Sequence, residues 1–161
     1  MFHVSCFMNS KGFTFIEVMV AISVTIVGIV GIYTLVPRVF SVVSTSKDKF
    51  ISSQLAQEGI ELIRNVRDSN WLAGKSWDNS LTGYEAGCEI DYNDSSPVSY
   101  QNRYLQIDSN GFYNYGQGAN TKFKRKITIS PESNLLAVEV EIIWQGKYSP
   151  LRVRETLYNW R

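Results

Sequence analysis

The uncharged stretch Val18–Val36 limits most strongly what this chain of 161 residues can fold into. With its flanking residues, the apolar segment extends over the 24 residues Phe13–Val36. As an α-helix it would be about 36 Å long at ~1.5 Å per residue, enough to cross a bilayer core of ~30 Å. Few domains of this size could enclose so apolar a helix in their interior. We therefore expect a membrane-spanning helix.

Two other uses of an apolar N-terminal segment fit the sequence less well. A secretory signal peptide has an apolar core of only ~7–15 residues and a cleavage site with small residues, whereas Leu35–Phe40 offers no such site. A lipoprotein signal ending at Cys6 fails because no apolar run precedes that cysteine. The balance of 16 Lys and Arg against 15 Asp and Glu also excludes a strongly basic nucleic-acid binder or an acidic tail as the main theme.

Glu17 is the one charge inside the apolar segment. A carboxylate near the centre of a membrane helix costs roughly 2.5–3.5 kcal/mol, and less near an end where the side chain reaches the interface. No Lys or Arg occurs between Lys11 and Arg38, so the helix itself supplies no partner. Glu17 is either a glutamate tolerated near the interface or the partner of a chain terminus or another molecule.

The segment Lys11-Gly-Phe-Thr-Phe-Ile-Glu17 and the apolar run after it resemble the class III signal of type IV prepilins and type II secretion pseudopilins. The resemblance implies that a membrane peptidase cuts between Gly12 and Phe13 and N-methylates Phe13. It also implies that Glu17 is needed for subunit assembly, where its carboxylate meets the terminal amine of a neighbouring subunit. Met8 gives a leader similar to those of the family, so we expect translation to start there, with Met1 as the alternative.

The same resemblance implies a set of partners and a location. The partners are the prepilin peptidase/methyltransferase, other pilin subunits, an inner-membrane assembly platform and membrane lipid. The leader would be cytoplasmic and the head exported from the bacterial inner membrane, before assembly into a pilus or pseudopilus. The flanking charges favour the opposite orientation, because only Lys11 precedes the apolar run while Arg38, Lys47 and Lys49 follow it, and the more positive side usually stays in the cytoplasm. The processing motif outweighs so small a difference.

Beyond Pro37, apolar residues from Val43 to Val66 recur at helical spacing. We expect one helix from Phe13 to Arg67, with Pro37 as the place for any bend. The expected parts are a cleaved leader 1–12, a membrane and assembly helix 13–36, its amphipathic continuation 37–68 and a globular head 69–161.

In the head, turn formers dominate residues 69–103, so we expect an irregular connection with one short strand. Two runs, 104–108 and 112–115, flank Ser109-Asn-Gly111 and predict a hairpin. Period-two patterns predict three further strands: the first includes Phe123–Ile129, the second Leu136–Ile143 and the third Leu151–Glu155. Turns are expected at 131–134 and 145–147. The expected fold is α+β, a long helix laid across one face of an antiparallel meander, as in the heads of pilins and pseudopilins.

Removal of residues 1–12 would leave no histidine and one cysteine, Cys88. This excludes Ser-His and Cys-His nucleophiles and histidine-based zinc sites, so we expect no catalytic residue, no cofactor and no metal site. Cys88 would be a free thiol or form an intermolecular disulfide. We expect Glu139 and Glu141 to lie on the solvent-facing side of a strand. Asp91–Asp94 lack the full spacing of a calcium-binding loop, so we expect a turn there.

Lys122-Phe-Lys-Arg-Lys126 is the only basic cluster. Strand alternation places its three lysines on one face, with Phe123 and Arg125 on the other. A solvent face that discourages aggregation is favoured over contact with DNA. The sequence as a whole predicts a non-enzymatic structural subunit, a minor pilin or pseudopilin. The alternative is a single-pass membrane-anchored module that binds a surface or DNA and is not polymerised.

Overall fold

The computed structural model describes residues 12–146 and 148–159. The expected leader residues 1–11, with Cys6 and both candidate start residues, lie outside the described residues, as does Lys147 of the expected turn at 145–147. The chain divides into two compact units, Met1–Val43 and Ser44–Arg161. Each unit is described by itself.

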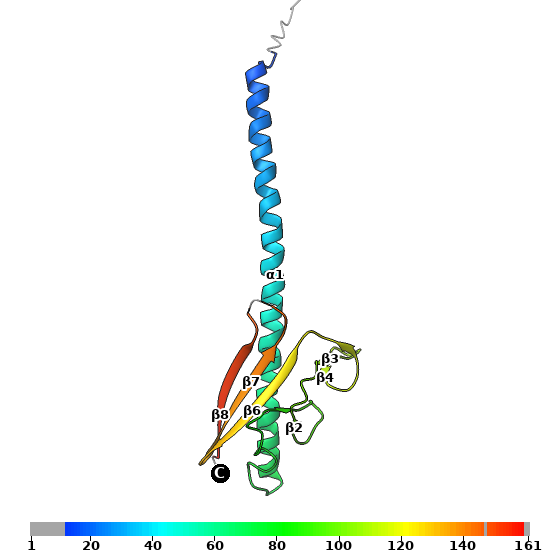
Figure 1. Ribbon diagram of the computed structural model, residues 1–161, viewed down its shortest axis with the longest axis vertical. Coiled ribbons are helices and arrows are strands. Elements are labelled where there is room, and N and C mark those ends of the chain that lie inside the picture. The colour runs from blue at the N-terminus through cyan, green and yellow to red at the C-terminus, as the bar shows by residue number, and fades with distance from the viewer. Residues whose placement is uncertain (1–11, 147, 160–161) are drawn as a thin grey trace, which may run out of the picture. The chain divides into compact units, whose positions relative to one another are not determined.

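The long helix α1 extends from Phe15 to Leu72 over 58 residues (Figure 1). The predicted helix is confirmed, and residues on both sides of Pro37 are helical. Up to Val43 every described side chain is exposed, including the whole apolar segment. Among the described residues, α1 is the one helix long and apolar enough to cross a membrane.

The helix continues five residues beyond the expected end at Arg67. Gly74, with φ at +66°, follows the last turn. The Gly74 N–H donates to the Trp71 carbonyl (3.1 Å) and the Lys75 N–H to the Asn70 carbonyl (2.9 Å). This is the Schellman arrangement, in which a glycine in the left-handed region ends a helix. The prediction stopped too early because it followed the apolar stripe instead of this glycine.

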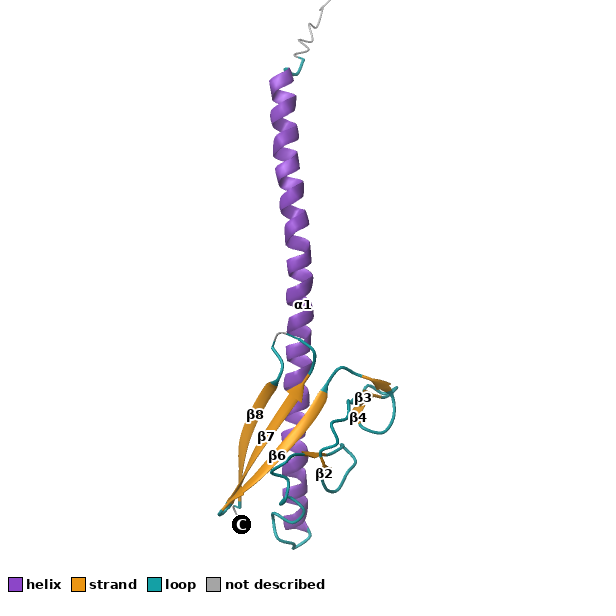
Figure 2. Cartoon of the chain, in the orientation of Figure 1, coloured by secondary structure: helices purple, strands orange, loops and turns teal. Residues whose placement is uncertain are grey.

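The second unit contains two antiparallel sheets (Figure 2). The larger sheet has the order β2-β1-β6-β7-β8, and the smaller one has the order β4-β3-β5. The strands are β1 (Cys88–Glu89), β2 (Val98–Ser99), β3 (Gln106–Ile107), β4 (Tyr113–Asn114), β5 (Ala119–Asn120), β6 (Lys124–Glu132), β7 (Leu135–Ile143) and β8 (Leu151–Tyr158).

The three long strands β6, β7 and β8 confirm the meander predicted for the C-terminal part. The turn between β6 and β7 is shorter than expected, because Glu132 already pairs with Leu135 and leaves Ser133-Asn134 as the loop. The predicted hairpin forms as β3 and β4, with Gln106 opposite Asn114. Its expected place in the same meander was wrong, since β1 is the strand beside β6.

The core lies between the second half of α1 and the inward face of the large sheet. Leu55, Ile60 and Ile63 of α1 are buried, as are Val138 and Val140 of β7. Gly59 permits the close approach of helix and sheet: a Cβ added there would lie 3.0 Å from Val140 Cγ1. The expected α+β layout, a long helix packed on an antiparallel sheet, is therefore confirmed.

Candidate functional site

The N-terminal segment around Gly12 and Phe13 is open to solvent. Phe13 is 82 % exposed, and no described atom lies within 4 Å of a Cβ added at Gly12. The described fold therefore places no steric demand for glycine at this position. A requirement for glycine at position 12 must therefore come from a molecule that binds this segment.

Thr14 caps the start of α1. Its Oγ1 accepts a hydrogen bond from the Glu17 backbone N–H at 3.3 Å, and its carbonyl accepts one from the Val18 N–H. The Thr14-Phe-Ile-Glu17 order is that of a capping box, in which a threonine and a glutamate three residues later flank the first turn. This role of Thr14 was not predicted, although its spacing to Glu17 was a sufficient signal.

Glu17 lies in the first turn of α1 with an exposed side chain. A negative charge in this turn is favourable because it faces the positive end of the helix dipole. Among the described residues no cation forms an ion pair with Glu17.

A second set of polar side chains lies inside the head and centres on Arg125, which is fully buried in β6. Its Nη1 donates to Glu58 Oε1 at 3.0 Å and, at 3.4 Å, to the Leu55 carbonyl, while Nη2 donates to the Ile90 carbonyl at 2.9 Å. The hydroxyl of Tyr115 donates to the Arg125 carbonyl at 3.2 Å. The guanidinium thus connects α1, β6 and the segment after β1.

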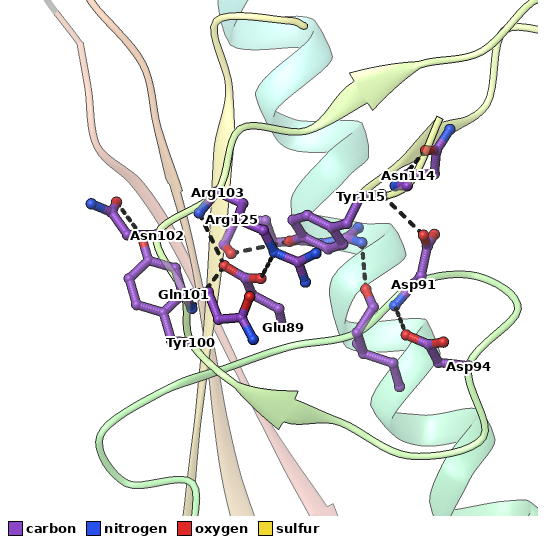
Figure 3. A network of polar contacts seen from close by, with 12 residues as sticks. Glu89, Asp91, Asp94, Tyr100, Gln101, Asn102, Arg103, Asn114, Tyr115 and Arg125 are labelled. Carbon is purple, nitrogen blue, oxygen red and sulfur yellow. Dashed lines mark hydrogen bonds and ion pairs between the residues drawn. The ribbon is translucent and has the colours of Figure 1, made fainter. Parts of the chain in front are cut away.

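Glu89 is the buried carboxylate of the same region (Figure 3). Its Oε1 accepts the backbone N–H groups of Gln101 (3.1 Å) and Arg103 (3.2 Å), and its Oε2 accepts Arg103 Nε at 2.9 Å. The Arg103 guanidinium lies 4.8 Å from the centre of the Tyr115 ring. Burial raises the pKa of Tyr115 to about 12. These groups satisfy one another and hold the connection after β1 against the sheet.

Cys88 is a buried free thiol beside Glu89. Burial, with a smaller contribution from the Glu89 charge, raises the pKa of the thiol to about 12. The free thiol was one of the two predicted states. An intermolecular disulfide in the folded head is disfavoured, because the sulfur is covered and protonated.

The acidic segment Asp91–Asp94 forms a turn. Asp94 Oδ2 accepts the Asp91 N–H at 2.9 Å, while the two oxygens of Asp91 accept the Tyr92 and Tyr115 N–H groups. Within the described residues, no group of three or more His, Cys, Asp or Glu side chains is placed to hold a metal ion. The carboxylates of Asp91 and Asp94 stabilise the loop backbone.

Cross-strand ion pairs cover the outer face of the large sheet. Glu139 accepts from Arg154 and Glu141 from Arg152, each at 2.6 Å, between residues directly opposite in β7 and β8. This agrees with the expected solvated face, since opposite charges on neighbouring strands stabilise a sheet modestly.

The basic cluster lies at the start of β6. The alternation is as predicted: Phe123 and Arg125 are buried while the lysines face outward. Lys122 Nζ pairs with Asp48 Oδ1 of α1 at 2.7 Å, and Lys124 Nζ donates to Asn102 Oδ1 at 3.0 Å. Both lysines line a cleft of about 400 Å³, together with Tyr104 and Trp144.

Comparison with known families identifies the N-terminal segment. Residues 7–33 match the family described as the prokaryotic N-terminal methylation motif. No curated protein and no solved structure shows significant similarity to the chain. The match includes Gly12, Phe13 and Glu17 and the first part of the exposed apolar helix. The chain therefore carries the class III prepilin motif, at the start of an α+β layout like that of pilins.

Proposed function

We propose that this protein is a structural subunit, a minor pilin or pseudopilin, of a type IV pilus-like or type II secretion filament. The observation that carries the proposal is the methylation motif at residues 7–33, which includes the first part of an exposed apolar helix. The motif implies processing by a prepilin peptidase and a membrane-anchored precursor. Cleavage between Gly12 and Phe13 and methylation of Phe13 by the same enzyme complete the processing step.

The open geometry at Gly12 supports this cleavage position. The chain itself leaves space for a side chain there, while a peptidase that closes around a scissile bond requires close approach of the backbone. A bulky residue at position 12 would block that approach without disturbing the fold.

Glu17 would act in assembly. Each subunit offers its terminal amine to Glu17 of a neighbour, which neutralises two charges that are costly in lipid. The pair also sets the axial register between helices, because apolar packing alone specifies register poorly in a membrane. Gly28 and Gly31 on the exposed helix leave room for the neighbouring helix. The head is exported and the inner membrane holds the subunit before assembly.

The test replaces Glu17 by Gln, with Val as the apolar counterpart. Glu17→Gln removes the charge yet keeps a side chain that a capping box accepts. We expect normal membrane insertion and cleavage, and a fall in filament incorporation of roughly tenfold or more, since a loss of ~1.4 kcal/mol per contact corresponds to a factor of ten. Immunoblots of sheared filaments against the membrane fraction measure incorporation.

Thr14→Ala is the matched control, because it removes the helix cap and keeps the carboxylate. Its incorporation should equal that of the wild type. Equal incorporation of Glu17→Gln and wild type would instead show that Glu17 is a glutamate tolerated near the interface, and absence of both proteins from the filaments would favour the unpolymerised, membrane-anchored binding module. A loss in Thr14→Ala as large as in Glu17→Gln would contradict a role that is specific to the Glu17 charge.

A further inference from the structure

The cleft at the start of β6 is lined by hydrogen-bond donors and positive charge. Its volume is about 400 Å³, and its lining belongs wholly to the unit from Ser44. The described lining residues include two lysines and two side-chain amides but no carboxylate. Lys122 pairs with Asp48 of α1 at 2.7 Å, whereas Lys124 forms no ion pair with any described residue. The lining therefore favours a ligand that accepts hydrogen bonds and carries negative charge.

The indole of Trp144 supplies an unused donor in the wall of this cleft. The residue is 6 % exposed, and its ring packs on Phe123 with 6.2 Å between the ring centres. Its Nε1–H has no hydrogen-bond acceptor within the described residues. Among the described side chains only Ser52 Oγ and Arg125 Nε are both unpartnered and fully covered, so Trp144 Nε1 remains accessible. The N–H of a buried tryptophan normally has a partner. This donor points to an acceptor that is not part of the chain.

Gly146 keeps the indole nitrogen open. A Cβ added at this glycine would lie 2.7 Å from Trp144 Nε1 and 3.1 Å from Trp144 Cδ1, closer than side chains tolerate without a shift. The backbone of Gly146 is not in the left-handed region, so its conformation does not require a glycine. The space beside Trp144 Nε1 is what this glycine provides.

Lys124 and Tyr104 add charge and an aromatic surface to the same lining. The ammonium of Lys124 lies 4.4 Å from the centre of the Tyr104 ring and donates to Asn102 Oδ1 at 3.0 Å. An ammonium has three donors, so Lys124 retains donors for an anion. Tyr104 is half exposed and offers a flat apolar wall. A cleft of about 400 Å³ has the size of a site for a whole small molecule, in which a few polar groups fix the orientation of an apolar body.

We infer that this cleft binds a small organic anion, a phosphate or carboxylate group on an apolar or aromatic body. The oxyanion accepts hydrogen bonds from Trp144 Nε1 and from the ammonium of Lys124, while the body packs on Tyr104. Lys122 adds positive charge and keeps its pair with Asp48. The site is built by the head alone, so it does not depend on processing or assembly and gives the head a recognition role beyond that of a structural subunit.

The test titrates the ¹⁵N-labelled full chain, in a non-ionic detergent, with phenyl phosphate and separately with benzoate. The indole N–H resonance of Trp144 is identified among the four tryptophans by its loss in Trp144→Phe. Binding of either probe should move this resonance downfield, because an anion accepts the N–H. Inorganic phosphate, which lacks the body, and benzyl alcohol, which lacks the charge, should each bind about tenfold more weakly or worse.

Three variants separate this site from general charge attraction and from misfolding. Lys124→Gln should weaken binding about tenfold, the usual loss when a hydrogen bond to a charged group is removed. Lys126→Gln removes the same charge from the same face of β6 outside the cleft lining, and should leave binding within about twofold of wild type. Gly146→Ala keeps every charge but fills the space beside the nitrogen, so it should also weaken binding.

The inference is overturned if neither probe moves the Trp144 resonance, or if inorganic phosphate binds as tightly as phenyl phosphate. It is equally overturned if Lys126→Gln loses as much binding as Lys124→Gln, or if Gly146→Ala binds fully. The three variants should be cleaved and incorporated like the wild type, so failure here is distinct from failure of the proposed processing and assembly.

Discussion

Arg125 shows how a single residue ties the head together. The sequence placed it correctly on the inward face of β6 beside Phe123, because alternation is local. The hydrogen-bond acceptors that compensate the burial of its charge could not be predicted, because they are distant in the sequence. They belong to Leu55 (70 residues away), Glu58 (67 residues away) and Ile90 (35 residues away). An arginine in line with core residues was nevertheless a signal that buried acceptors were required.

Replacing Arg125 by Met should destabilise the head. Methionine fills similar space but leaves the buried Ile90 carbonyl without its guanidinium donor. A buried acceptor that loses its donor costs about 1–3 kcal/mol, and Glu58, whose side chain is 34 % exposed, adds little because water replaces its cation. Arg154→Met, which breaks the exposed pair with Glu139, should cost at most about 1 kcal/mol. Urea unfolding of the detergent-solubilised chain, followed by circular dichroism, measures both, and similar losses would contradict the account of Arg125.

At the scale of elements, prediction succeeded where a pattern is long. The helix, β6, β7 and β8 each repeat their apolar period several times, and all four were found. The two-residue strands β1, β2 and β5 carry no period of their own, and tertiary pairing alone defines them. The hairpin was recognised from its turn residues, but which sheet it joins depends on contacts that the local sequence does not contain.

Gly59 tests the packing of α1 on the sheet. A side chain there would meet Val140 at 3.0 Å and Arg125 Cδ at 3.1 Å. Gly59→Val should therefore destabilise the head by about 1–3 kcal/mol, the usual cost of overpacking. Gln57→Val places the same residue on the exposed face of the same helix and should change stability by less than about 1 kcal/mol. The difference between their melting temperatures reports the helix–sheet contact, and equal melting temperatures would show that it is loosely packed.

At the scale of the whole molecule, the two units differ in how their apolar side chains are covered. The unit up to Val43 carries the processing motif and an apolar helix with no burial of its own, so its exposed surface calls for lipid or other helices. The unit from Ser44 has its own core and satisfies nearly all its buried polar groups internally. The seven-residue motif was readable from the sequence because its residues are adjacent in the chain, whereas the ion pair of Lys122 with Asp48 of α1 could not be predicted, since folding brings together residues that are far apart in the sequence.

The N-terminal residue of the mature chain tests the central claim most directly. The chain is produced together with a prepilin peptidase that processes a known prepilin, and its N-terminal peptide is analysed by mass spectrometry. We predict that the peptide begins at Phe13 and carries one N-methyl group, and that a Gly12→Leu variant stays uncut in the membrane. An unmethylated terminus, cleavage at another bond, or normal maturation of Gly12→Leu would contradict it.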